Sequence, residues 1–117
     1  MSEMNQQQCG ALGAVIHDVV MERNAQHAKW GEQSHPDGTG GMALRRLAAL
    51  GHSANDARDT CDQAFKRSEG TYAHILWEEF AEAMECTDKD KLRDELIQVA
   101  AVAVAWVEKL DREWGDR

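Results

Sequence analysis

The chain has 117 residues, which suffices for one domain with a core of its own. Its 21 acidic and 13 basic residues give a formal net charge of −8. This balance argues against nonspecific binding to a nucleic acid polymer or to an anionic membrane surface, because both carry negative charge. It stays compatible with binding of a nucleotide whose phosphates are neutralised by a metal ion.

Targeting signals are missing from the sequence. The first residues, with Glu3 and a run of three glutamines, lack the basic and apolar regions of a signal peptide. The longest apolar run, residues 99–107, is shorter than the ~20 residues that span a bilayer. The three cysteines are widely spaced without a CxxC pair, which favours free thiols over disulfides. We expect a cytoplasmic protein with no membrane contact and with residues 1–10 flexible.

The first predicted helix covers residues 11–29. Helical periodicity dominates the chain, and no stretch alternates convincingly as a strand. The inner stripe of this helix is apolar at its start and contains Leu12, Val15, Ile16 and Val19. Its continuation is polar and contains Arg23, Gln26, His27 and Trp30. Such a change along one face often marks the place where a core opens into a cleft.

A glycine-rich segment, residues 31–41, follows this helix and is a loop by composition. No strand precedes it and no GKS/T pattern follows, so the nucleotide-loop motifs do not apply and a simple connection is the plainer interpretation. The junction could still bind a substrate, with Trp30 stacked on a base and Arg23 or Lys29 on phosphate. The alternative is that Trp30 caps the core and its neighbours are surface residues. The candidate substrate-binding residues are Arg23, Gln26, Lys29, Trp30, Gln33 and His35.

The rest of the chain predicts three more helical regions. The second covers residues 42–67, with a break near 51–53, and the third covers 72–86, with Thr71 as its N-cap. The fourth covers 91–114. Because the connection before it is short, the last two helices should pack antiparallel. We therefore expect a single all-α domain over residues 1–117, a four-helix bundle or its equivalent completed by oligomerisation.

Acidic side chains fall on the apolar faces of the last two predicted helices. At about 100° per residue, Glu79 points with Leu76 and Ala83, and Glu95 points with the apolar stripe of its own helix. Glu82 lies at the edge of the same face as Glu79. Ionised acids in a core need partners, and a cluster of them needs a cation.

The spacing of these acids favours a divalent metal site. Glu79 and Glu82 are three residues apart, as are Glu95 and Gln98, so both pairs could converge from antiparallel helices. Oxygen ligands suit Mg²⁺, with Mn²⁺ as the alternative ion, and such an ion can activate water and offset phosphoryl charge. Glu78 is the least buried of the acids on the wheel and is the candidate catalytic base. On its own, a repeat of glutamates is usually a solvated face.

The pattern Glu79-x-x-Glu82, twelve intervening residues and Glu95-x-x-Gln98 resembles the ExxE…ExxD signature of the MazG-like all-α nucleoside triphosphate pyrophosphohydrolases, in their short bacterial and phage form. The segments 72–83, 94–101 and 29–36 also resemble that family, and the resemblance covers most of the chain. It implies a helical bundle, usually a dimer or tetramer, that uses Mg²⁺ to hydrolyse a (d)NTP to the monophosphate and pyrophosphate.

The resemblance implies metal binding by Glu79, Glu82 and Glu95, with Glu78 and Gln98 assisting. Gln98 stands where the family has an acid, and an amide oxygen can bind a metal but adds no negative charge. The metal affinity of the site is therefore expected to be lower with Gln98 than with an acid at this position. Two alternatives stay open: a nucleotide-binding or helical interaction module with weak or no turnover, and a structural helical dimer whose acids are merely solvated.

Overall fold

The computed structural model describes residues 2–43, 45 and 53–114. Within these ranges the secondary structure is helical, with α1 (Gln6–Trp30), α3 (Ala54–Lys66), α4 (Tyr72–Glu85) and α5 (Lys89–Trp114) and no strand. The all-α fold is thus confirmed for the described chain. The predicted break near 51–53 lies mostly outside the described residues, as does much of the first half of the predicted helix 42–67.

The first helix begins earlier than the sequence predicted. Asn5 and Gln8 form a capping box: the Asn5 side chain accepts from the Gln8 amide at 2.8 Å, and the Gln8 side chain accepts from the Asn5 amide at 2.8 Å. Residues 6–10 are therefore helical, so α1 begins five residues before the predicted start at residue 11, within the segment that was expected to be flexible. Gly31 ends the helix with φ +70°, a conformation that suits glycine.

The remaining helix ends are set by side-chain caps. Thr71 caps α4 as predicted, and its hydroxyl accepts from the His74 amide at 3.2 Å. Asp88 accepts from the amide of Asp90 at 2.8 Å, so α5 begins at Lys89, two residues before the predicted start. Glu85, at the end of α4, accepts from the Ala54 amide at 2.7 Å and so ties the start of α3 to α4.

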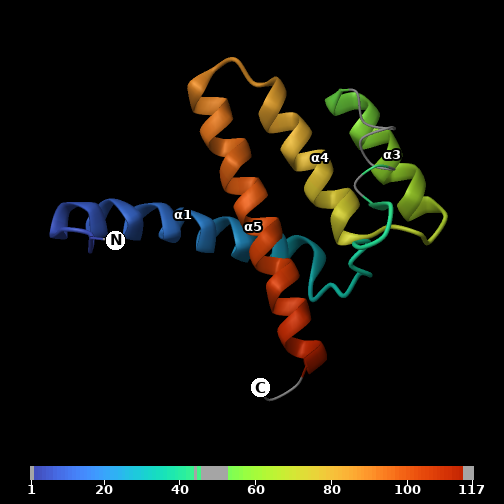
Figure 1. The fold of residues 1–117 in the computed structure, drawn as a ribbon, viewed down its shortest axis with the longest axis horizontal. Helices are drawn as coiled ribbons and strands as arrows, with labels where there is room; N and C mark the ends of the chain where they lie inside the picture. The colour runs from blue at the N-terminus through green and yellow to red at the C-terminus, as the bar shows by residue number, and fades with distance from the viewer. Residues whose placement is uncertain (1, 44, 46–52, 115–117) are drawn as a thin grey trace.

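Three helices lie side by side in the order α3, α4, α5, and α1 crosses α5 (Figure 1). The antiparallel arrangement predicted for α4 and α5 is confirmed. Small buried side chains let α3 approach α4 closely, namely Ala54, Ala57, Cys61 and Ala64. The first half of α1 projects away from the other helices. Among the described helices, none is both long and apolar enough to cross a membrane.

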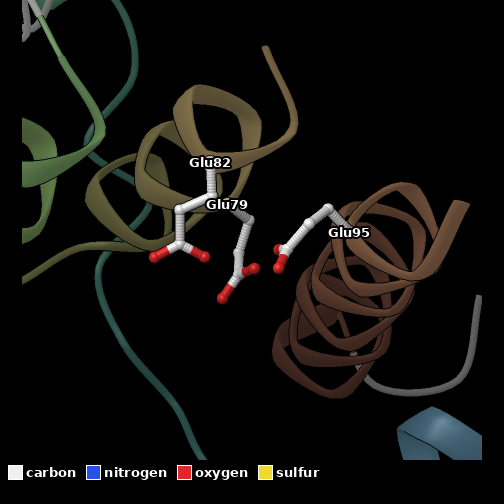
Figure 2. A group of neighbouring side chains, drawn as sticks. All are labelled: Glu79, Glu82 and Glu95. Carbon is white, nitrogen blue, oxygen red and sulfur yellow. The ribbon is translucent and has the colours of Figure 1, made fainter. Parts of the chain in front are cut away.

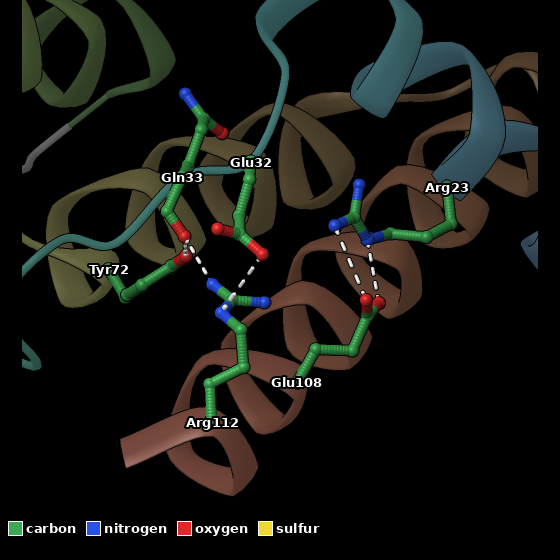
Figure 3. Close-up of polar contacts among 6 residues, drawn as sticks. All are labelled: Arg23, Glu32, Gln33, Tyr72, Glu108 and Arg112. Atoms are coloured by element: carbon green, nitrogen blue, oxygen red, sulfur yellow. Dashed lines mark hydrogen bonds and ion pairs between the residues drawn. The ribbon is translucent and has the colours of Figure 1, made fainter.

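The segment after α1 is held against α5 by polar contacts. The Gln33 carbonyl accepts from the Arg112 guanidinium at 2.6 Å and from the Tyr72 hydroxyl at 3.1 Å (Figure 3). Asp37 accepts from the Trp106 indole at 2.6 Å and from the Lys109 ammonium at 3.1 Å. This segment is therefore fixed to the C-terminal half of α5.

Candidate metal centre

Three carboxylates converge between α4 and α5. Glu79 and Glu82 come from successive turns of α4, and Glu95 comes from the facing side of α5 (Figure 2). One oxygen from each residue lies within 4.8 Å of the others. Close packing makes this approach feasible, because Ala83 and Ala101, on the same two helices, are almost completely buried and small. We call Glu79, Glu82 and Glu95 the acidic triad.

Burial and neighbouring charges raise the pKa of two members of the acidic triad, Glu79 and Glu95. Burial first, and then the neighbouring charges of Glu82 and Glu95, raise the pKa of Glu79 to about 7. Burial, followed by the charge of Glu82, also raises the pKa of Glu95. Three like charges are thus held together against their mutual repulsion. A divalent cation would relieve this repulsion and favour the ionised form of all three groups.

A pocket of about 320 Å³ opens beside the acidic triad. Its other lining residues come from the C-terminal half of α1 and from α5, namely Glu22, Ala25, Gln26, Lys29, Trp30 and Gln98. Trp30 is 54% exposed, and the Lys29 ammonium lies 4.5 Å from the centroid of its ring. The pocket therefore has the acidic triad on one wall, and on the other wall the Glu22 carboxylate together with an aromatic ring and a cation.

Three of the predicted substrate-binding residues do not line this pocket. Arg23 pairs with Glu108 of α5 at 2.8 Å (Figure 3). Gln33 is held by its carbonyl to α5, and His35 packs edge-on against the rings of Phe65 and Tyr72 at 5.0 and 5.2 Å between centroids. The polar contacts that fix the loop after α1 to α5 explain the placement of Gln33 and His35, and the ion pair with Glu108 explains that of Arg23. Gln26, Lys29 and Trp30 do line the pocket, as does Gln98.

Glu78 points away from the pocket toward α3. Its carboxylate interacts with the Cys61 thiol and lies 3.6 Å from the Arg58 guanidinium. Its side chain is 19% exposed and that of Glu82 is 20% exposed, so Glu78 is as buried as Glu82 and does not stand out as the predicted least buried acid. The helical wheel missed this because α3 covers that side of α4. Burial is the main cause of the raised pKa of Glu78.

Two residues near the triad were absent from the predicted site. Glu22 lines the pocket, and its position three residues after Val19 and four before Gln26 puts it on the predicted inner stripe, so the periodicity could have found it. Arg58 of α3 donates to Glu82 at 2.7 Å. Only the packing of α3 on α4 reveals this contact, because Arg58 has the sequence surroundings of a solvated face.

Comparison of the chain with protein-family models, with curated proteins and with solved structures finds no match.

Proposed function

We propose that this protein is a Mg²⁺-dependent nucleoside triphosphate pyrophosphohydrolase of the MazG-like type that its sequence resembles. The reaction is hydrolysis of the α–β phosphoanhydride of a (d)NTP, in which water is consumed and a (d)NMP and pyrophosphate are formed. The observation that supports it most is the acidic triad, whose oxygens lie within 4.8 Å of one another on the wall of an open pocket.

The donor set of this site fits a hard divalent cation. Carboxylate oxygens from Glu79, Glu82 and Glu95 would hold Mg²⁺ or Mn²⁺, and the amide oxygen of Gln98 is available on the same pocket wall. When bound, such an ion supplies Lewis-acid activation of water and offsets charge on the phosphoryl group. The raised pKa of Glu79 and Glu95 means that the chain holds these acids in an environment that favours their neutral form until a cation compensates them.

The α1 wall of the pocket offers contacts for the rest of a nucleotide. The exposed Trp30 ring provides a flat face on which a base can stack. Lys29 provides a positive charge for a phosphate, and Gln26 provides amide donors and acceptors. Glu78 remains the predicted acceptor of the water proton, although its carboxylate points toward α3, so this role requires a water or a rotation of the side chain to connect it with the pocket.

The test is pyrophosphate release from a panel of dNTPs and NTPs with Mg²⁺, Mn²⁺ or EDTA. We expect metal-dependent release from at least one nucleotide and none with EDTA. Nucleotide binding without release would instead support the nucleotide-binding module, which the uncharged Gln98 favours. If the chain neither binds a nucleotide nor releases pyrophosphate, the alternative of a structural helical dimer is favoured.

We also propose that the chain assembles as a homodimer or homotetramer. Apolar side chains on the first two thirds of α1 are about half exposed, including Leu12, Val15, Ile16, Val20 and Met21. Exposed apolar side chains of this number on one helix lower its stability in water unless another surface covers them. The accessible surface of the chain is 8409 Å², against roughly 6,400 Å² expected for a folded monomer of this mass. Sedimentation equilibrium should show an oligomer that Ile16→Glu dissociates, and a wild-type monomer at all concentrations would contradict this.

A further inference from the structure

Arg58 reaches the acidic triad from outside the pocket. It lies on α3, one residue after the buried Ala57, at the edge of the surface that packs on α4. Its guanidinium donates to the Glu82 carboxylate at 2.7 Å and lies 3.6 Å from the Glu78 carboxylate. The side chain is 50% exposed, and it does not line the pocket.

Glu82 therefore lies between a cation on α3 and a like charge on α5. Its Oε1 accepts the hydrogen bond from Arg58, while the carboxylate also interacts with Glu95 across the gap between α4 and α5. Figure 2 shows one oxygen of Glu82 directed toward Glu79 and the other directed away from the triad. A glutamate side chain has several freely rotating bonds, so a fixed contact on one oxygen restricts where the other oxygen can lie.

We propose that Arg58 is a positioning residue for the metal site: it fixes the Glu82 carboxylate so that the free oxygen faces Glu79 and Glu95. This inference rests on the proposed metal-dependent function. Groups that hydrogen-bond to metal-binding carboxylates orient them, and their loss commonly lowers metal affinity 10–100-fold.

The positive charge of Arg58 weakens metal binding, whereas its orientation of Glu82 strengthens it. A cation next to the triad repels a divalent ion, so removal of the charge alone would strengthen metal binding. Because half of the side chain is in water, this repulsion is screened, whereas the short hydrogen bond to Glu82 is lost outright on truncation. The two effects therefore predict opposite signs for the same substitution, and orientation is expected to dominate.

The experiment compares Mn²⁺ binding to the wild type, Arg58→Ala, Arg58→Lys and Arg67→Ala, using the electron paramagnetic resonance signal of free Mn²⁺. Arg67 is the matched control, because it is an exposed arginine at the end of α3 that pairs only loosely with Glu69, at 3.8 Å. We expect Arg58→Ala to weaken binding about 10-fold or more. Arg67→Ala should bind as the wild type does. Arg58→Lys, which can still donate to Glu82, should recover part of the loss.

A second readout separates positioning from general damage to the fold. In the pyrophosphate assay, Arg58→Ala should raise the Mg²⁺ concentration needed for half activation, with KM for the nucleotide unchanged at saturating Mg²⁺. Unchanged or tighter Mn²⁺ binding in Arg58→Ala would overturn the positioning role while leaving the metal site intact. Failure of the wild type to bind Mn²⁺ would instead overturn the proposed function, and this inference with it.

Discussion

Helix α5 carries two clusters of charged side chains, about 20 Å apart along the helix. One cluster pairs opposite charges, and the other gathers like charges. Near its end, Lys109 is buried between Asp37 and Glu113, with contacts of 3.1 and 2.6 Å, and Asp37 also accepts from Trp106. Near its start, Glu95 faces two further glutamates. We call the first set, Asp37, Trp106, Lys109 and Glu113, the loop anchor.

The contrast separates a cluster whose charges are compensated from a cluster of acids that lack such compensation. In the loop anchor each charge meets its opposite, and the pKa of Asp37 is lowered, first by the Trp106 hydrogen bond and then by Lys109. In the acidic triad, burial and like charges raise the pKa of Glu79 and Glu95. Only the second arrangement costs stability in the protein alone, and such perturbed groups concentrate at sites that bind ligands or perform chemistry.

The largest expected effect is on turnover. Glu79→Gln keeps the shape of the side chain but removes one metal-binding charge, so metal-dependent pyrophosphate release should fall about 100-fold or more. Glu69→Gln, at an exposed position, is the control and should retain wild-type activity. Equal turnover in the wild type and Glu79→Gln would show that the acidic triad is not the site of the reaction.

The next effect is on stability, through the raised pKa of Glu79. Because the folded chain binds this proton more tightly than the unfolded chain, the free energy of unfolding should fall as pH rises from about 4.5 to about 7 without metal. The expected loss is about 1–2 kcal/mol, reduced from the full shift because the carboxylate is partly hydrated. Urea titrations at a series of pH values measure it.

Two variations identify the source of that pH dependence. Glu79→Gln should flatten the slope, because the titrating group is gone. Mg²⁺ at about 100 times its dissociation constant should stabilise the wild type by about 2.7 kcal/mol at neutral pH. The same Mg²⁺ concentration should stabilise Glu79→Gln less, because this variant has only two of the three carboxylates. A slope that is the same in the wild type and in Glu79→Gln would assign it to other groups.

The smallest effect concerns the loop anchor. Trp106→Phe keeps the stacking on Tyr72, whose ring lies 5.6 Å away and nearly parallel, but removes the indole donor to Asp37. The free energy of unfolding should fall by about 1–1.5 kcal/mol at neutral pH. Since the folded pKa of Asp37 is lowered, this stability is present above its ordinary pKa and is lost as pH falls through the folded value.

The measurement for this variant is chemical unfolding at neutral and at acidic pH. The difference between Trp106→Phe and the wild type should shrink in acid, where Asp37 becomes protonated in both proteins. Metal-dependent turnover should be unaffected, because Trp106 does not line the pocket. A difference that persists unchanged in acid would point to packing of the indole instead of its hydrogen bond.

Helical periodicity predicted which side chains share one face of a helix. The pairing of Glu79 with Glu82 and the facing position of Glu95 follow from spacing, from apolar stripes and from one short connection. The N-cap at Thr71 follows from local chemistry in the same way. These features require no knowledge of which other helix lies nearby.

The rest depends on neighbours that a single helix does not specify. Glu78 points where α3 happens to pack, and Arg58 meets Glu82 only because of that packing. His35 was grouped with the substrate-binding residues because it follows Trp30 closely, yet the loop carries it to the rings of Phe65 and Tyr72. Proximity in sequence to Trp30 therefore did not predict the position of a loop residue such as His35.

Helix α1 contributes to two surfaces, the wall of the pocket and a row of exposed apolar side chains. Its C-terminal part supplies the pocket wall with Gln26, Lys29 and Trp30, and its projecting part carries the exposed apolar side chains. If α1, an unbroken helix of 25 residues, tilted as one body on the proposed assembly, the width of the pocket would change with its angle. Thermodynamic linkage would make this effect reciprocal. If association of the subunits raised the affinity for nucleotide by some factor, bound nucleotide would raise the association constant of the subunits by the same factor.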